Sequence, residues 1–164
     1  MKIKKYLFAS TLTLLLAPGV LFAQGPLDPS LLLKPATDAW PTYHGDYSGR
    51  HYSTLKQINA SNVKGLTLAW IHRVNLSPFG ANVGGEGPDS ALSATAGMEF
   101  GGPQIKAIPL MVNGVLYFAM PDHAFAVDAR TGRQIWHYAW KTRGGIHIGN
   151  RGMGMYGDYL FFET

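Results

Sequence analysis

Two basic side chains, Arg151 and Lys106, have the type and the placement to recognise an anion. They lie 45 residues apart, and each comes shortly before a run of mostly apolar residues. The planar guanidinium of an arginine binds two carboxylate oxygens at once, whereas a lysine ammonium acts as a point charge. Structural roles remain open for both residues: a salt bridge between repeats for Arg151, and a solvated position in a loop for Lys106.

The sequence contains no pattern typical of a metal site or of a phosphate-binding loop. Five further histidines show no metal-site spacing and have no cysteine near them, so we interpret them as surface or packing residues. They are His44, His51, His72, His123 and His137. The glycines at 84–87 and 101–102 fit neither a Walker lysine pattern nor G-x-G-x-x-G, which argues against a phosphate-binding loop.

The elements that must position Arg151 and Lys106 form a repeat. Met111–Phe118 and Met155–Phe162 match at an offset of 44 residues, each with a turn dipeptide between two apolar runs. Repeats of about 40–45 residues are typical of the four-stranded blades of a propeller. We therefore predict an all-β fold, a β-propeller of which only the first one to two blades are present.

Four short strands are expected in the first blade: Pro109–Val112, Val115–Met120, His123–Asp128 and Arg133–Tyr138. The dipeptide Asn113-Gly114 joins the first two and suits the left-handed conformations of a type I′ turn. A second blade begins with Gly152–Tyr156 and Tyr159–Glu163. Because the chain then stops on an apolar strand with no partner, it is expected to be a truncated piece of a larger protein.

Residues 40–102 are expected to contain little regular structure. Trp40–Ser53 alternates aromatic residues with turn formers and predicts an irregular cap. Ile58–Lys64 could form one short helical turn with Asn59 or Ser61 as its cap, and Gly65–Val74 predicts a strand. Ser77–Gly102 is rich in glycine and alanine and is interpreted as a long loop over one mouth of the propeller.

Residues 1–23 predict a secretory signal peptide, because three lysines precede an apolar stretch from Tyr6 to Leu16. The alternative is a retained anchor, although eleven apolar residues are too few to span a bilayer comfortably. Residues 24–39 carry three prolines and are expected to form an N-terminal arm without regular structure.

Most of the net positive charge of the chain lies in its expected signal peptide. Removing residues 1–23 takes away three of the fourteen basic residues and lowers the formal balance from +4 to +1. The remaining domain therefore offers no electrostatic argument for binding nucleic acid. Because the chain has no cysteine, it contains no disulfide and no acylated lipoprotein cysteine.

The run from Ala126 to Trp136 is interpreted first as a structural element. Asp128 and Thr131 can bond the amides of the turn, and Gly132 can take a positive φ. Trp136 offers a large face for packing between blades.

This run has the pattern A-x-D-x-x-T-G-x-x-x-W and resembles the tryptophan-docking motif of the quinoprotein methanol and alcohol dehydrogenases. These are eight-bladed propellers that use pyrroloquinoline quinone (PQQ). Residues 40–70 resemble the entry sequence of their mature chains, and Asn150-Arg151-Gly152 resembles the motif that opens their next blade. The resemblance covers nearly all of 40–164, which we interpret as a partial quinoprotein dehydrogenase-like propeller.

The resemblance implies a periplasmic oxidoreductase that binds PQQ beside a calcium ion and oxidises an alcohol or sugar hydroxyl. Its electrons would pass through the quinone to a cytochrome c or a membrane quinone. The catalytic aspartate and the calcium ligands of such proteins lie farther along the chain, so none is assigned here. The fragment alone is expected to be inactive and poorly folded, because neighbouring repeats supply the interfaces of each blade.

The resemblance also assigns roles to three residues. Arg151 would pair with carboxylates of PQQ. Lys106 stands where the family usually has a cofactor-binding glutamate, and could pair with a quinone oxygen or a carboxylate instead. The family's adjacent cysteine pair is replaced by Gly144–Gly149, so Ile146 or His147 could cover the cofactor ring, unless His147 lies exposed in a glycine-rich turn.

A second interpretation is a non-enzymatic propeller of the same repeat type that acts as a binding or assembly scaffold. The docking motif is compatible with this interpretation, since scaffold propellers share it. The missing lipidation cysteine argues against its lipoprotein form, and the Asn150-Arg151-Gly152 motif favours quinone binding.

Overall fold

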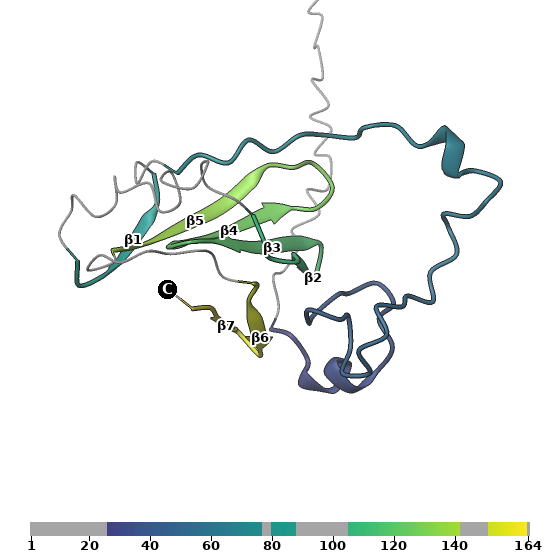
Figure 1. The fold of residues 1–164 in the computed structure, drawn as a ribbon, viewed down its shortest axis with the longest axis horizontal. Coiled ribbons are helices and arrows are strands. Elements are labelled where there is room, and N and C mark those ends of the chain that lie inside the picture. The colour runs from purple at the N-terminus through teal and green to yellow at the C-terminus, as the bar shows by residue number, and fades with distance from the viewer. Residues whose placement is uncertain (1–25, 77–79, 88–104, 142–150, 164) are drawn as a thin grey trace, which may run out of the picture.

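The computed structural model describes residues 26–76, 80–87, 105–141 and 151–163. Its strands form two sheets, as Figure 1 shows. The first has the order β1-β5-β4-β3-β2, and the second is the pair β6-β7. The bounds are β1 Asn82–Gly85, β2 Leu110–Val112, β3 Val115–Met120, β4 His123–Asp128, β5 Gln134–Lys141, β6 Gly154–Tyr156 and β7 Tyr159–Phe161, with 3₁₀ helices η1 Pro29–Leu33 and η2 Val63–Gly65. None of the helices in the described ranges has the length and apolar character needed to traverse a bilayer.

Strands β2 to β5 form the predicted blade as an antiparallel meander. Asn113 and Gly114 have φ values of 50° and 77°, and these left-handed conformations are those of a type I′ turn. The residues flanking this turn, Val112 and Val115, pair directly. β2, the first strand of this meander, lies at one edge of the sheet.

The turn between β4 and β5 is held by the carboxylate of Asp128. This carboxylate accepts hydrogen bonds from the backbone N–H of Arg130 and from both the N–H and the hydroxyl of Thr131, at 2.8–3.0 Å. These bonds hold the pKa of Asp128 below its usual value. Gly132 closes the turn with a φ of 73°, as predicted for this position.

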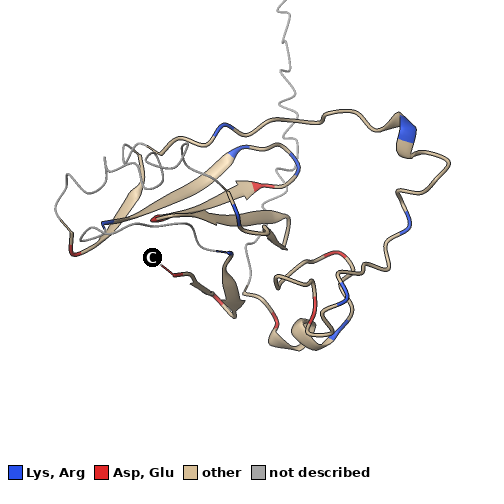
Figure 2. Ribbon diagram, viewed as in Figure 1, with Lys and Arg blue, Asp and Glu red and all other residues tan. Residues whose placement is uncertain are grey.

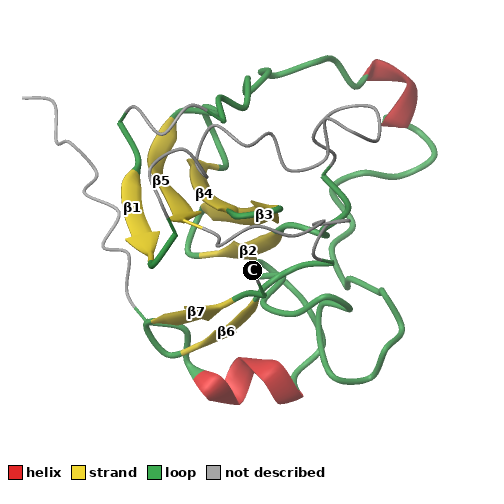
Figure 3. Ribbon diagram, turned by 60° about the vertical axis from the view of Figure 1, so that its left-hand side comes forward, coloured by secondary structure: helices red, strands yellow, loops and turns green. Residues whose placement is uncertain are grey.

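The second sheet repeats the first hairpin. β6 starts at Gly154, 44 residues after the start of β2, and β7 starts at Tyr159, 44 residues after the start of β3. Figure 3 shows β6 and β7 as a separate layer beside the larger sheet. Buried Leu110, Ala119 and Ala124 pack against Met153, and Trp136 joins this core. The predicted packing of Trp136 between successive blades is therefore found.

The long loop predicted at Ser77–Gly102 contains a strand. β1 adds to the sheet in parallel to β5, with Gly84 opposite Trp140 and Gly85 opposite Lys141. A Cβ atom on Gly84 would collide with the side chain of Tyr138, so only glycine allows this close approach. The rest of the predicted loop, and its place over a mouth of the propeller, lie outside the described residues.

The N-terminal arm is more ordered than predicted. Asp28 caps the short helix η1 by accepting a hydrogen bond from the N–H of Ser30 at 2.9 Å. Leu27 and Leu32 are buried and pack with Val112 of the first sheet. Apolar residues of the arm therefore extend the core, which is why the segment does not simply lie over the surface.

The two elements predicted between residues 58 and 74 are only partly found. A 3₁₀ turn, η2, occupies Val63–Gly65, at the end of the predicted helical turn. The predicted strand Gly65–Val74 is not part of any ladder among the described strands. It is nevertheless fixed on the first blade, because the indole N–H of Trp70 donates to the carbonyl of Ala129 at 3.2 Å.

Candidate functional site

Arg151 lies at the rim of a cavity beside the start of the second sheet. It comes three residues before β6, and its side chain is exposed. The cavity has a volume of about 480 Å³, within the range common for ligand sites. Its lining consists of Tyr43, Ile108, Arg151, Gly152, Met153, Gly154, Phe161, Phe162 and Glu163.

The guanidinium of Arg151 has no carboxylate within 4 Å among the described residues. Arg50 and Asp46, away from the cavity, do form an ion pair. The sequence left a structural salt bridge open for Arg151, and the described part of the chain contains none. A guanidinium that has no partner in the described ranges and lines a partly apolar cavity is suited to bind a carboxylate in bidentate geometry.

Apolar and aromatic groups form the wall behind Arg151. Gly152 follows with a φ of 149°, and a Cβ atom there would lie 3.9 Å from both the Ile108 carbonyl and the Tyr43 ring. Met153 is buried in the core between the two sheets. The lining thus combines one cation and one carboxylate with apolar and aromatic residues, and ligand pockets of proteins have this mixture of apolar walls with a few polar groups.

Apart from Arg151 and Gly152, the sequence did not predict the lining of this cavity, and three of the missed residues come from separate segments. Tyr43 comes from the N-terminal segment, Ile108 precedes β2, and Glu163 follows β7. They lie up to 120 residues apart in the chain, so no local motif connects them. Of the three, only Tyr43 stood in a segment whose aromatic spacing had been noticed, and that spacing indicated packing.

Lys106 occupies the corresponding place one repeat earlier. It is exposed and lies four residues before β2, as Arg151 lies three residues before β6. The described lining of the Arg151 cavity includes Ile108 but not Lys106. His147, the third predicted site residue, lies outside the described residues, as does Asn150.

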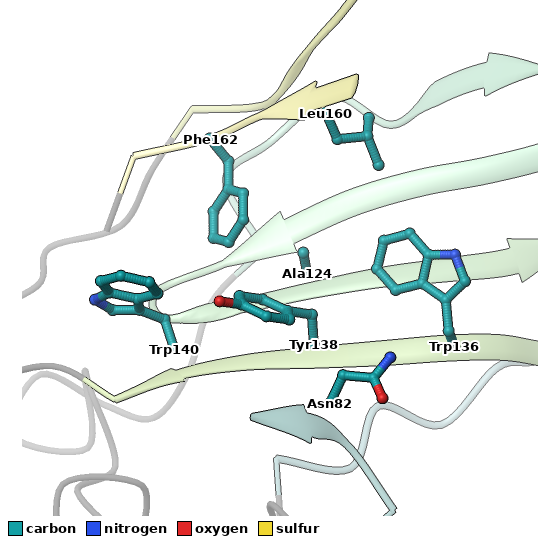
Figure 4. Close-up of a pocket in the computed structure, with 7 residues that line it drawn as sticks. All are labelled: Asn82, Ala124, Trp136, Tyr138, Trp140, Leu160 and Phe162. Carbon is teal, nitrogen blue, oxygen red and sulfur yellow. The ribbon is translucent and has the colours of Figure 1, made fainter. Parts of the chain in front are cut away.

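A second cavity of about 590 Å³ lies between the two sheets and is aromatic in character. Figure 4 shows Trp136, Tyr138 and Trp140 in a row along β5, with Leu160 of β7 and Phe162, which follows β7, opposite. Tyr138 and Phe162 make an edge contact with ring centroids 6.1 Å apart. Asn82 and Ala124 complete the described lining, in which no side chain is charged. This cavity belongs to the packing between blades.

Two histidine pairs form, and both were interpreted from the sequence as surface or packing residues. His123 and His137 are buried, with Nδ1 and Nε2 2.9 Å apart. Burial, and secondarily the neighbouring imidazole, lowers the pKa of His123 to about 4. His44 and His51 are exposed and bonded at 2.6 Å. Within the described ranges no three His, Asp or Glu side chains gather to hold a metal ion.

Most charged side chains lie away from the sheets. In Figure 2 the basic and acidic residues are scattered over the loops and turns, and no single face of the described chain gathers one sign of charge.

A four-stranded meander with a docking turn, followed after 44 residues by the hairpin β6-β7, is typical of successive blades of a β-propeller. The profile of the PQQ glucose/ethanol/alcohol dehydrogenase β-propeller domain matches residues 40–159. The chain therefore belongs to the PQQ-dependent alcohol dehydrogenase family.

Individual relatives agree with this assignment. The quinohemoprotein alcohol dehydrogenase of Comamonas testosteroni is 36% identical over 103 residues, which are 62% of this chain and 11% of that protein. Quinohemoprotein alcohol dehydrogenase ADH IIB of Pseudomonas putida is 30% identical over 170 residues, covering 98% of this chain and 21% of that protein. The quinoprotein glucose dehydrogenase of Escherichia coli is 31% identical over 112 residues, covering 67% and 12%.

A solved structure shows the same fold. The crystal structure of the Comamonas testosteroni enzyme matches with a TM-score of 0.52 and 28% identity, over 76% of this chain and 16% of that one. The chain thus spans between about a tenth and a fifth of the length of these relatives. The predicted fold class, a partial propeller of the quinoprotein type, is confirmed.

Proposed function

We propose that the complete protein is a PQQ-dependent dehydrogenase that oxidises an alcohol or sugar hydroxyl. The observation that carries this proposal is the exposed Arg151, which has no carboxylate partner among the described residues and lines a partly apolar cavity at the start of the second blade. Family membership supports it, because the relatives carry the names of alcohol and glucose dehydrogenases. PQQ, when bound, would supply a two-electron acceptor, which the side chains of the protein cannot supply themselves.

Arg151 would hold the cofactor by a carboxylate. Its guanidinium would form two parallel hydrogen bonds to that group, and the walls at Ile108 and Met153 would keep water from the ring face. Glu163 also lines the cavity. Its negative charge would repel a carboxylate, so we expect the anionic end of the cofactor to lie on the side of Arg151 away from Glu163.

Lys106 and His147 are proposed as further cofactor contacts. Lys106 lies at the equivalent place of the neighbouring repeat, and its ammonium would pair with a second carboxylate or with a quinone oxygen. His147, within the glycine-rich run 144–149, would cover the ring in place of a cysteine pair. A calcium ion beside the quinone would be held by residues beyond Thr164.

The proposal also includes the cellular location of the protein and its electron acceptor. A signal peptide at residues 1–23 would direct the protein to the periplasm. Electrons would leave the reduced quinone for a cytochrome c or a membrane quinone. The word quinohemoprotein in the names of two relatives supports a haem carrier.

The proposal is tested with the full-length protein, expressed with its own downstream sequence. PQQ binding is measured by titration with calcium present, and activity by alcohol-dependent reduction of a dye. The variant Arg151→Ala should weaken PQQ binding by about 100-fold, since a charge-assisted bidentate contact contributes about 1.5–3 kcal/mol. Arg151→Lys keeps the positive charge but cannot form two parallel hydrogen bonds to a carboxylate. Its affinity for PQQ should therefore lie between those of the unaltered protein and of Arg151→Ala.

The matched control is Arg50→Ala, because Arg50 is also exposed but lies outside the cavity lining. Its ion pair with Asp46 spans 4.0 Å at the surface and should contribute little. If the full-length protein binds no PQQ and reduces no dye with any alcohol or sugar, the scaffold interpretation takes the place of the enzyme.

A further inference from the structure

Two exposed imidazole rings meet in the N-terminal loop 40–51. The Nδ1 atom of His44 lies 2.6 Å from the Nε2 atom of His51. The ring planes are at 84° to each other, and the ring centroids are 4.5 Å apart. Both side chains are exposed, so solvent reaches the pair. The structure thus brings together two histidines that are seven positions apart and have no metal-site spacing in the sequence.

The contact between these two nitrogens can be made by a proton or by a metal ion. In the hydrogen-bonded pair, one ring donates its N–H to the lone pair of the other. When each ring carries its proton on its other nitrogen, both lone pairs face the contact and can bind a cation. Two metal–nitrogen bonds of about 2.0–2.1 Å, in right-angled or tetrahedral geometry, place the nitrogens about 2.9–3.4 Å apart. The rings therefore need to separate by less than about 1 Å to hold an ion.

Aromatic contacts hold both rings in place. The ring of Tyr43 makes edge contacts with His44 and His51, at centroid distances of 4.9 and 5.9 Å. The ring of His51 also lies beside that of Trp40, with centroids 6.5 Å apart. Rings that are already oriented lose little freedom when they bind an ion, and this raises the affinity of a site.

The backbone of the loop is folded tightly around Trp40. The N–H of Gly45 donates to the carbonyl of Thr42 at 3.1 Å, and Gly45 has a φ of 88°. A Cβ atom at Gly45 would lie 3.0 Å from the indole ring of Trp40. His51 has a φ of 52°, which is uncommon for a residue with a Cβ atom. This fold of the chain is what returns His51 to the side of His44.

A carboxylate near the pair favours positive charge there. Asp46 accepts hydrogen bonds from the hydroxyl and the N–H of Ser48. These bonds, and to a smaller degree the nearby Arg50 and His44, hold the pKa of Asp46 below its usual value. Asp46 therefore stays ionised at neutral pH and attracts a cation to the pair. Arg50, whose guanidinium lies 4.0 Å from this carboxylate, offsets part of the attraction.

The ligand atoms of the pair define the class of ion. Imidazole nitrogens suit zinc, copper and nickel, whereas magnesium and calcium prefer oxygen ligands. Within the described ranges no third His, Asp or Glu completes a site, so water would fill the other coordination positions. The other described pair, His123 and His137, is buried and offers no such access for a hydrated ion.

We propose that His44 and His51 together bind a hydrated divalent transition-metal ion of the zinc type. The ion takes the place of the proton between Nδ1 of His44 and Nε2 of His51. Neither histidine belongs to the lining of the Arg151 cavity, so the site is separate from the proposed cofactor site. The inference holds whether or not the protein binds PQQ.

The proposal is tested by calorimetric titration of Zn²⁺ into the full-length protein, with calcium present throughout. The variants His44→Gln and His51→Gln should each weaken one zinc site by about 100-fold, because each loses one of two linked ligands. Lys56→Gln is the control, since Lys56 is exposed and lies outside the loop. It should leave zinc binding within about twofold. Zinc binding that is unchanged in both histidine variants would overturn the proposal.

Chemical modification gives a second measurement on the unaltered protein, in case a variant does not fold. Diethyl pyrocarbonate modifies accessible imidazole nitrogens, and mass spectrometry of the peptides reports each histidine separately. At a zinc concentration about ten times Kd, His44 and His51 should react about tenfold more slowly, because only the unoccupied fraction reacts. Mg²⁺ at the same concentration should not protect them. Equal protection by Mg²⁺, no protection by Zn²⁺, or rings that do not react even without metal would each overturn the proposal.

Discussion

The indole ring of Trp70 covers Gly132 so closely that no side chain fits between them. A Cβ atom at Gly132 would lie 2.5 Å from Cε3 of Trp70, and the glycine has a φ of 73°. The indole N–H also donates to the carbonyl of Ala129 in the same turn. The turn between β4 and β5 is thus packed against a residue 59 positions before Ala129 in the chain.

Gly132→Ala should therefore destabilise the protein by about 2–4 kcal/mol. The positive φ alone costs about 1–2 kcal/mol for a residue with a Cβ atom, and the displaced indole loses packing and its hydrogen bond. Urea denaturation of the full-length protein measures the loss. Gly114→Ala is the matched control, because Gly114 has a φ of 77° but nothing within 4 Å of its Cβ position. Equal losses of stability in Gly132→Ala and Gly114→Ala would mean that close packing of Trp70 on the turn contributes nothing.

The buried pair His123–His137 should make stability depend on pH in the mildly acidic range. The folded state holds the pKa of His123 near 4, against an ordinary value of 6.5, and burial lowers that of His137 as well. Between these values the unfolded chain binds more protons than the folded one, so stability falls as the pH falls from 6.5 toward 4. The expected loss is roughly 2–3 kcal/mol, measured by urea denaturation at several pH values.

Replacing both buried rings tests the cause of that decline. In the double variant His123→Phe, His137→Phe the rings can still stack on Phe125, and the decline below pH 6.5 should flatten. The control changes His44 and His51 to Phe, since this pair is bonded in the same way but is exposed. The control should keep the decline. A flat profile in the unaltered protein would contradict the prediction.

Gly84→Ala should detach β1 from the sheet. Its Cβ atom would overlap the ring of Tyr138, which is held in the aromatic row along β5. Hydrogen exchange of the amides at 82–85 in the full-length protein should then become at least about tenfold faster. Gly65→Ala is the control, because its Cβ position is open and its φ is not positive. Unchanged exchange in Gly84→Ala would show that Tyr138 moves aside.

The sequence predicted some of these strands and missed another. The strands that it predicted have local signals, whereas the missed strand depends on pairing with a distant segment. β2 to β5 were predicted because alternation and turn residues such as Asn113-Gly114 are local signals. β1 was missed because Asn82–Gly85 has weak strand propensity and depends on pairing with β5. Conversely, Gly65–Val74 was predicted as a strand from its local pattern but joins no ladder among the described strands.

In the candidate site too, the sequence predicted the residue that stands in a local motif and missed those that packing brings to it. The motif around Arg151 indicated the basic residue, and the repeat placed it before the first strand of the second blade. The walls of its cavity, Tyr43, Ile108 and Glu163, come together only through the packing of three segments. The predicted roles of Lys106 and His147 stay predictions, because they concern a cofactor and, for His147, a residue outside the described ranges.

Reversing the charge of Lys106 should weaken cofactor binding if its ammonium faces PQQ. The variant Lys106→Glu, measured by PQQ titration of the full-length protein with calcium, should bind about tenfold less tightly, because a negative charge would then face a trianion. Lys64→Glu makes the same change of charge at an exposed position in η2 and should leave the affinity within about twofold, since distant surface charges are screened by salt. An affinity that rises with Lys106→Glu would show that the position works with an acidic side chain, and Lys106 would then not be a contact to a carboxylate.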